Sequence, residues 1–381
     1  MRKIILAVAF IFVIAIQNIA GATDLNSVDW DSAPRFNNKA AFIKYIQNCE
    51  KTCKSYIPVI FGNGVFVNAE EFLNIYKNAQ YANILWWNGR DGKPEKVLYE
   101  LNVYPGAKVA YAYETGKTQI LNGDERRLYN IATQIVNAAK RQPTTLQKEL
   151  FIHEKITEMV TYYNVTTNSK TPRHCTAVGA LIDGRANCQG YTDAFYMLGT
   201  MAGFNVGKMT GNSNNGPHVW NTIEFGDGRV YAVDVTFDDA SFTFEKRNEY
   251  NSYIYFNAPQ EILQATHTWN AADSPKLQPV IDGRYFYYTA EFNDTNGKMF
   301  GFYSNSAEDA LGYIAERIAK GGWRMSWGMA PYNKQYADTK FSLNRLVREI
   351  LPNNYDWYGK AKMSVVQRGN WMFYTVDATA N

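Results

Sequence analysis

One cysteine, one histidine and one aspartate follow one another in an order that suits catalysis by a thiol. Cys188 lies in NCQGYTDAF, His218 opens HVWNTIEF, and Asp234 lies near the end of RVYAVDVTF. In thiol catalysis a thiolate attacks a carbonyl carbon, an imidazole takes and returns the proton, and a carboxylate orients the imidazole. The three residues are therefore candidates for the nucleophile, its base and the group that orients the base.

The segment around Cys188 predicts a helix with the cysteine in its first turn. Gly184 and Asn187 precede the cysteine, and an apolar helical face continues until a stop at Gly203. The positive end of a helix and its unpaired N–H groups stabilise a thiolate. The N–H of Cys188 is also a candidate donor to the oxyanion of a tetrahedral intermediate. The alternative is a buried structural thiol.

The position of Asp234 relative to His218 depends on the turn between two predicted strands. If Gly226-Asp227-Gly228 is a three-residue loop, Thr236 lies opposite His218, and Asp234 is a diagonal neighbour on the same face. A two-residue turn would place the two side chains on opposite faces. The glycines at both ends of the loop favour the three-residue form. We expect Asp238 and Asp239, the nearby alternatives, to cap the following turn.

These segments resemble the three motif blocks of the transglutaminase-like superfamily. The blocks are GRANCQGYTDAF, HVWNTIEF and VYAVDVTFDD, and the helix KELFIHEKITEMVTYY before them also fits. The resemblance covers roughly residues 125–270. It implies an α+β, papain-like core, in which a helix bearing Cys188 packs on an antiparallel sheet bearing His218 and Asp234. It also implies acyl transfer from an amide through a thioester, with these three residues as the triad and no cofactor.

The acceptor in the second step separates the functions that such a site supports. Water as acceptor gives a cysteine peptidase or amidase, and an amine gives a protein-glutamine transglutaminase. The flanking β-sandwich domains, the calcium-binding segments and the oxyanion-stabilising tryptophan of animal transglutaminases have no visible counterpart in this sequence. The resemblance therefore favours hydrolysis over cross-linking. A non-catalytic scaffold protein with a degenerate catalytic domain is a third alternative.

A metal site and structural roles are the competing interpretations of the other histidines and cysteines. His174, Cys175, Cys188 and His218 have the right ligand types for a metal but not a metal-binding spacing. We expect His153 to be a satisfied core histidine. We expect His267, in THTW, to be structural, with a place in the lining of the substrate groove as the alternative. Cys49 and Cys53 could form a disulfide, as could Cys53 and Cys175; otherwise Cys175 is a buried thiol.

The first 22 residues have the three-part pattern of a secretory signal. Arg2 and Lys3 precede an apolar run, and cleavage is expected after Ala22. Without Arg2 and Lys3 the chain has 37 basic and 36 acidic residues, which gives no electrostatic basis for binding nucleic acid. No segment reaches the length of a stable membrane span. We expect a secreted, periplasmic or cell-surface protein that acts on a protein or peptide, with cell-wall peptides among the candidates.

The remaining pattern divides the chain into a catalytic domain and two flanking modules. We expect a small α/β module at 23–116, the catalytic domain at 117–276 and a second α/β module at 277–381. In the first module we expect a helix at 68–80 and then strands at 95–103 and 107–114 that flank a turn at Tyr104-Pro105-Gly106. In the second we expect helices at 306–320 and 341–351, a strand at 323–329 and a hairpin around Arg368-Gly369-Asn370. The two modules have a similar order of helices and strands, which indicates a duplication, although chance similarity of a common α/β order is the alternative.

Overall fold

The computed structural model describes most of the chain between residues 25 and 378. The described ranges are 25–89, 92–214, 216–242, 253–288, 303–304, 324–329, 361–369 and 371–378. The predicted signal at 1–22 lies outside them. Contacts divide the chain into two compact units, Met1–Asn137 with Tyr163–Gly203 and Ala138–Tyr162 with Phe204–Asn381. Helices and strands occur in both units, so the fold class is α+β as predicted. The division into 23–116, 117–276 and 277–381 stays a prediction.

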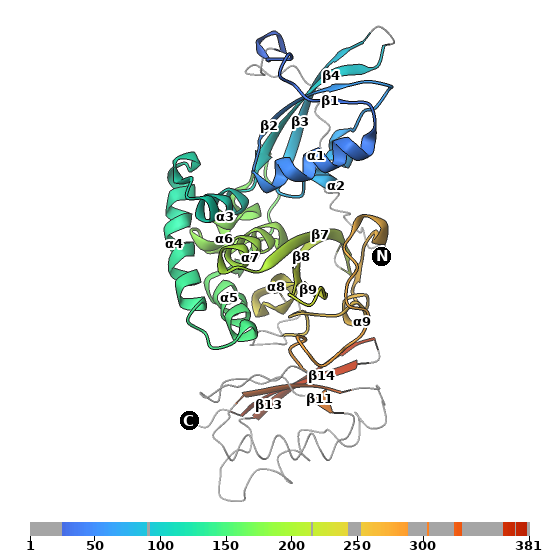
Figure 1. The fold of residues 1–381 in the computed structure, drawn as a ribbon. Helices are drawn as coiled ribbons and strands as arrows, with labels where there is room; N and C mark the ends of the chain where they lie inside the picture. Colours follow the sequence, from blue (N-terminus) through green and yellow to red (C-terminus); the bar gives the residue numbers. More distant parts are fainter. Residues whose placement is uncertain are drawn as a thin grey trace, which may run out of the picture. The chain divides into compact units, whose positions relative to one another are not determined.

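A four-stranded sheet with two helices against it forms the N-terminal part of the first unit (Figure 1). Its strands are β1 (Arg35–Phe36), β2 (Tyr56–Phe61), β3 (Ala79–Asn88) and β4 (Pro94–Val103), in the order β1-β2-β4-β3. The helices are α1 (Lys39–Lys51) and α2 (Ala69–Ile75). Asn38 and Asn68 cap them, each accepting a backbone N–H with its side-chain oxygen. Phe42, Phe72 and Tyr99 meet in the core beneath them.

The expectation of a strand at 107–114 was wrong, because this segment is helix α3 (Pro105–Thr115). Val109, Tyr111 and Tyr113 alternate with smaller residues and so imitate a strand pattern. Pro105, however, is the first residue of the helix, where its fixed φ angle and missing N–H cost nothing. The strand that pairs with β4 in its place is β3, which the pattern had assigned partly to a helix.

The first unit continues with the helix that begins at Cys188 and two further helices. They are α4 (Gly123–Ala139), most of which belongs to this unit, α6 (Ala177–Leu181) and α7 (Cys188–Ala202). Helix α7 begins at Cys188 and ends at Gly203, whose φ of 96° forms a left-handed cap. Its predicted apolar face is buried and consists of Tyr191, Phe195, Leu198 and Met201. The predicted extent of this helix is therefore confirmed.

The second unit contains an antiparallel sheet with the order β10-β7-β8-β9. Its strands are β7 (Asn205–Ser213), β8 (Gly216–Glu224), β9 (Val230–Val233) and β10 (His267–Thr268). Among its described residues, the helices are α5 (Thr145–Met159), α8 (Val235–Asp238) and α9 (Gln260–Leu263). The shorter elements within the described ranges are β5 (Thr161–Tyr162), β6 (Arg185–Ala186) and single turns of 3-10 helix at Leu25–Ser27, Thr118–Ile120, Arg173–Cys175, Ala240–Phe242 and Ala271–Asp273.

The three-residue loop between β8 and β9 is confirmed. The N–H of Phe225 donates to the carbonyl of Arg229 over 3.0 Å, and Thr222 pairs with Ala232. Strand β9 nevertheless ends at Val233, before the expected pairing of His218 with Thr236. Asp234 therefore reaches His218 from the cap of helix α8 and not as a diagonal neighbour within the sheet.

The C-terminal sheet has the same topology as the N-terminal one. Its strands are β11 (Tyr303–Ser304), β12 (Arg324–Met329), β13 (Ala361–Arg368) and β14 (Trp371–Ala378), in the order β11-β12-β14-β13. In each sheet the first two strands are parallel and the other pairs antiparallel. The predicted strand at 323–329 and the hairpin around Gly369 are confirmed, whereas the predicted helices at 306–320 and 341–351 lie outside the described residues.

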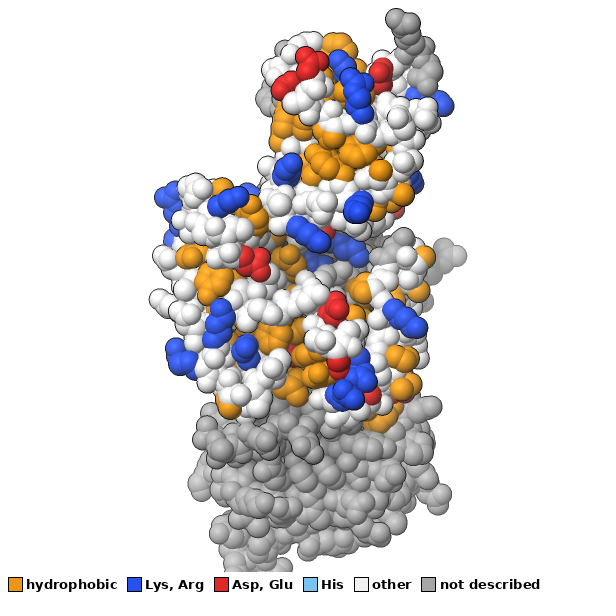
Figure 2. All heavy atoms as spheres, in the orientation of Figure 1, with side chains coloured by type: hydrophobic (Ala, Val, Ile, Leu, Met, Phe, Trp, Pro, Cys, Tyr) orange, Lys and Arg blue, Asp and Glu red, His pale blue; other side chains and the backbone are white. Residues whose placement is uncertain are grey.

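All four cysteines are described, and all are free thiols. Cys49 is buried in the core of the N-terminal sheet, and the Cys53 thiol donates to the carbonyl of Ala107 over 3.4 Å. Among the described residues, no helix combines the length and apolar character that crossing a membrane needs. Figure 2 shows Lys and Arg side chains spread over one face among acidic, hydrophobic and uncharged ones.

Candidate active site

Cys188 is the first residue of helix α7, directly after a well-defined cap. The side-chain oxygen of Asn187 accepts the N–H groups of Gln189 over 3.1 Å and Gly190 over 3.4 Å. The cap therefore takes up two of the amides that begin the helix. Gly184, with a φ of 69°, turns the chain before β6 and the cap. The backbone thus places the Cys188 sulfur at the positive end of a 15-residue helix.

Asn187 also binds a second cysteine, Cys175, which has a structural role. Nδ2 of Asn187 donates to Sγ of Cys175 over 3.1 Å, and its backbone N–H donates to the carbonyl of His174 over 2.9 Å. Burial raises the pKa of the Cys175 thiol to about 11, against a smaller opposing effect of the Asn187 hydrogen bond. Gly190 lets this segment approach, since a Cβ there would lie 2.6 Å from the carbonyl oxygen of His174.

The second unit brings His218 and Asp234 together, as the sequence predicted. Nε2 of His218, on β8, lies 2.7 Å from Oδ2 of Asp234, and both side chains are buried. Asp234 is the N-cap of α8, and its Oδ1 accepts the N–H groups of Thr236 and Phe237 over 3.1 and 3.2 Å. The cap thus fixes the carboxylate, which in turn fixes the imidazole.

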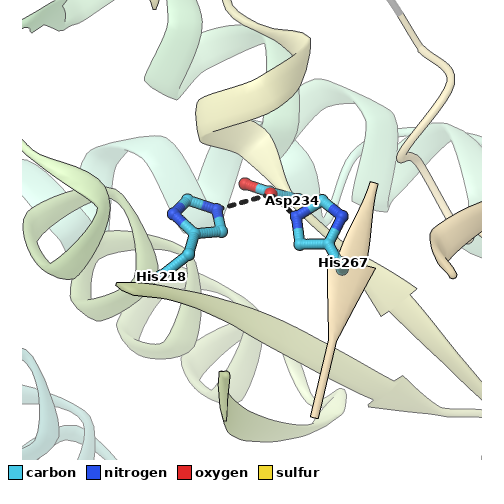
Figure 3. Close-up of side chains that lie close together, drawn as sticks. All are labelled: His218, Asp234 and His267. Carbon is cyan, nitrogen blue, oxygen red and sulfur yellow. Dashed lines mark hydrogen bonds and ion pairs between the residues drawn. The ribbon is translucent and has the colours of Figure 1, made fainter. Parts of the chain in front are cut away.

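Asp234 remains ionised because its partners outweigh its burial. Burial alone would raise the pKa of this carboxyl group. The charge and hydrogen bond of His218, with the hydrogen bond of His267, hold the pKa below its usual range. An ionised carboxylate only accepts hydrogen bonds, so Nε2 of His218 must carry the proton in this pair. In the neutral ring Nδ1 is then the basic nitrogen, and it lies on the side of the ring away from Asp234 (Figure 3).

Aromatic rings enclose the imidazole of His218. The ring stacks on Trp220 with a centroid distance of 5.9 Å and an interplanar angle of 21°. Phe237, three residues after the α8 N-cap Asp234, packs against it at 4.9 Å. These contacts restrict the ring to one orientation and exclude water from its bond to Asp234.

A second imidazole binds the same carboxylate, a contact that the sequence did not predict. Nε2 of His267, on β10, lies 3.1 Å from Oδ2 of Asp234. Figure 3 shows the His218 and His267 rings on opposite sides of the carboxylate. Strand β10 reaches this position by pairing with β7, His267 opposite Ser213. The only sequence signal was the rarity of histidine, since the chain has four.

These three side chains also form the one described group that could hold a metal ion. The ligating atoms of His218, Asp234 and His267 all lie within 4.8 Å of one another. Of the metal ligands that the sequence offered, His174, Cys175, Cys188 and His218, this group contains only His218. Both Nε2 atoms are at hydrogen-bonding distances from one carboxylate oxygen, and a metal would have to displace both protons. Hydrogen bonding alone accounts for the geometry.

The other acidic and histidine candidates have structural positions. His153 is a buried core histidine with Nε2 3.1 Å from Oδ2 of Asp238. Its Nδ1 is buried without a hydrogen-bond partner among the described residues, so only half of the expected satisfaction is present. Asp238 also accepts the N–H of Tyr255 over 3.0 Å, so it holds two segments together. Asp239 does cap the following turn, through the N–H of Ser241.

Comparison with known proteins gives partial similarities. No family model matches the chain. No curated protein matches it either. A solved structure described as a TGase is 13% identical, with a TM-score of 0.27, over 54% of this chain and 59% of that one. A proposed cysteine protease from Cytophaga hutchinsonii is 16% identical, with a TM-score of 0.24, over 40% and 61%.

A third similar structure is LapG from Legionella pneumophila, 14% identical, with a TM-score of 0.23, over 34% of this chain and 72% of that one. The chain spans about three fifths of the length of the first two structures. At such TM-scores the similarities carry no conclusion about activity.

Proposed function

We propose that the protein is a thiol enzyme that cleaves peptide-like amides, with Cys188 as nucleophile, His218 as base and Asp234 as the group that orients the base. The observation that carries the proposal is the buried His218–Asp234 pair, in which Nε2 of the imidazole lies 2.7 Å from the carboxylate. The pair leaves Nδ1 as the nitrogen that takes a proton. Cys188, at the start of α7, is in a position that favours the thiolate.

The proposed reaction passes through a thioester. The thiolate of Cys188 attacks the amide carbonyl carbon, and the oxyanion that forms accepts a hydrogen bond from the N–H of Cys188. When the C–N bond breaks, the protonated His218 gives its proton to the leaving amine. His218 then takes a proton from water, which attacks the thioester and releases the acid and Cys188. This sequence requires the sulfur and Nδ1 to come within hydrogen-bond reach during turnover.

The proposal extends to the architecture and location of the enzyme. We place the catalytic helix and the antiparallel sheet in a papain-like core, flanked by two small α/β modules. The common order and direction of strands in the sheets β1–β4 and β11–β14 support a duplicated module. The N-terminal signal pattern supports secretion to the periplasm, cell surface or medium. The substrate in this proposal is a protein or peptide.

Alkylation of Cys188 as a function of pH tests the proposed pair of nucleophile and base. We expect iodoacetamide to modify Cys188 in the wild type at pH 6, where a free thiol with a pKa of about 8.5 reacts slowly. In His218→Ala, Cys188 should no longer react at pH 6 but should react again when the pH is raised to about 9. Cys188→Ala should abolish both modification and activity. The proposal would be contradicted if Cys188 of the wild type were alkylated at the rate of a free thiol at every pH.

Acceptor competition separates hydrolysis from amine transfer. With casein as acyl donor and a fluorescent cadaverine as acceptor, a peptidase releases new amino termini and incorporates little dye. A transglutaminase incorporates the dye and releases ammonia. We expect the first result, and Cys188→Ala provides the background for both measurements. If neither product forms with casein or a peptide library although Cys188 reacts as predicted, the non-catalytic alternative is favoured.

A further inference from the structure

A continuous chain of hydrogen bonds leads from the C-terminal hairpin to the His218–Asp234 pair. Nε of Arg368, the last residue of β13, donates to Oη of Tyr255 over 2.6 Å. Oη of Tyr255 lies 2.8 Å from Oγ1 of Thr266, which lies 2.9 Å from Nδ1 of His267. Nε2 of His267 completes the chain at Oδ2 of Asp234 over 3.1 Å. Tyr255, Thr266 and His267 are all buried.

The groups at the two ends of this chain determine which partner donates in every hydrogen bond between them. The ionised Asp234 can only accept, so Nε2 of His267 carries a proton and, in a neutral ring, Nδ1 accepts. Thr266 must then donate to Nδ1 and accept from Tyr255. At the other end Arg368 can only donate, so the Tyr255 oxygen accepts from it and donates its own proton to Thr266. Every group in the chain is satisfied in this arrangement.

The electrostatic surroundings favour the same protonation states. Burial lowers the pKa of His267, against the opposing hydrogen bond and charge of Asp234, and favours a neutral ring. The carbonyl of Leu263 favours a charged ring, but this effect is the smallest one on His267, and that carbonyl already accepts the N–H of Thr266. Burial also raises the pKa of Tyr255, so its phenol keeps the proton that it donates.

We propose that His267 is a positioning residue for catalysis, held as the Nε2–H tautomer by the chain Arg368, Tyr255, Thr266. This inference rests on the proposed function for its catalytic part. With His267 and His218 on Oδ2 and two backbone amides on Oδ1, the carboxylate of Asp234 has four donors and cannot rotate. Tyr255 also holds the backbone of this residue, since its carbonyl accepts the N–H of Asp234 over 3.1 Å. The C-terminal hairpin thereby becomes part of the site.

Nitrogen NMR of the histidine rings tests the chain without any reference to activity. The protein has four histidines, so a sample labelled with ¹⁵N at histidine gives a spectrum that single His→Gln variants can assign. We expect His267 to be neutral at pH 7, with its proton on Nε2 and with Nδ1 showing the shift of a hydrogen-bond acceptor. A charged ring, or a proton on Nδ1 alone, would overturn the proposal whatever the enzyme does.

Rates of the proposed reaction test the positioning role. Losing a hydrogen bond to a charged group reduces kcat by roughly ten- to a hundredfold, which we expect for His267→Phe, with KM little changed. His267→Gln keeps one donor and should recover most of this loss. Thr266→Val and Arg368→Gln should reduce kcat by roughly two- to tenfold and move the Nδ1 signal of His267. Arg284→Gln, which changes an exposed arginine of the same unit, is the matched control and should change neither.

The combined results separate this inference from the proposed function. If His267 has the expected tautomer but Cys188 reacts independently of His218, the hydrogen-bond chain stands and the proposed function fails. If Cys188 depends on His218 but Thr266→Val and Arg368→Gln change neither the His267 signals nor kcat, the function stands and the positioning role is wrong. Circular dichroism melting of each variant identifies a rate loss that comes only from unfolding.

Discussion

Oδ2 of Asp193 accepts a hydrogen bond from the backbone N–H of Gly106 over 3.0 Å, although the two residues are 87 positions apart. The same oxygen accepts the N–H of Ala177 over 2.9 Å. Gly106 and Ala177 lie in the first turns of α3 and α6, so one carboxylate on α7 binds the positive ends of two other helices. This contact fixes the helix that begins with Cys188 against its neighbours.

Gly106→Ala should destabilise the protein because the carboxylate approaches this glycine too closely for a side chain. A Cβ would lie 2.6 Å from Oδ1 and 2.7 Å from the carbonyl oxygen of Asp193. We expect a loss of about 1–3 kcal/mol in the free energy of unfolding, measured by urea titration. Gly123→Ala is the matched control, since Gly123 begins α4 and nothing lies within 4 Å of its Cβ position. Equal effects of the two substitutions would contradict this account.

Cys188 should react with alkylating agents well before Cys175. With a pKa of about 11, Cys175 at pH 8 has roughly a hundredfold less thiolate than an ordinary thiol. Timed treatment with iodoacetamide, followed by mass spectrometry of the peptides, measures both sites in one sample. Cys188→Ser serves as the control for peptide assignment. Modification of Cys175 at the rate of Cys188 would show that Cys175 is not the protected thiol that we describe.

Local signals predicted the elements that carry the site. The helix of Cys188 was predictable from its apolar period and from Asn187 and Gly203 at its ends, and all three signals act within a few residues. The loop at Gly226-Asp227-Gly228 was predictable because glycine at both ends suits a three-residue turn. The register of β8 and β9 followed from the loop, whereas Asp234 reaches His218 from the cap of α8.

Contacts between distant segments decided what the sequence could not predict. His267 binds Asp234 from 33 positions away, through the pairing of β10 with β7, and no local pattern specifies that pairing. Segment 105–115 has residues that alternate as in a strand, yet the burial of Val109 and Ala112 among other helices selects the helix. Strand β9 ends at Val233 because the next residue, Asp234, caps α8. The alternation of apolar residues does not predict whether a residue continues the strand or caps a helix.

Glu149→Gln should remove a loss of stability that the wild type shows as pH rises. Burial raises the pKa of Glu149 to about 8, against the hydrogen bond from Asn257, and Oε1 has no partner among the described residues. The folded protein therefore binds this proton more tightly than the unfolded chain. Its contribution is complete below about pH 4.5 and is lost as pH rises towards 8, by roughly 3–6 kcal/mol. Urea titrations of both proteins at pH 5 and pH 8 measure it. The prediction would be contradicted if the difference in the free energy of unfolding between the wild type and Glu149→Gln were the same at pH 5 and pH 8.

Protonation of His267 should destabilise the protein in mildly acidic solution. Burial lowers the pKa of this ring, so the unfolded chain binds the proton more readily. The stability that the neutral ring contributes is complete above the ordinary histidine pKa of about 6.5 and is lost as pH falls through the lower folded value. We expect His267→Gln to flatten the decline in melting temperature between pH 7 and pH 5. If His267→Gln leaves the decline in melting temperature unchanged, another group causes the decline. His174→Gln is the control for the loss of a different histidine.

Gly211→Ala should separate β10 from β7 and thereby weaken the bond between His267 and Asp234. A Cβ at this position would collide with the carbonyl oxygen of Thr268 and lie 2.9 Å from Cη2 of Trp220. Overpacking of this kind costs about 1–3 kcal/mol, and here the short strand β10 is the part most able to move. We expect faster solvent exchange of the His267 Nε2–H proton in NMR spectra and a lower kcat. Thr210→Ala, an exposed position on the same strand, should leave both unchanged. A slow-exchanging His267 proton in Gly211→Ala would show that β10 does not depend on this close approach.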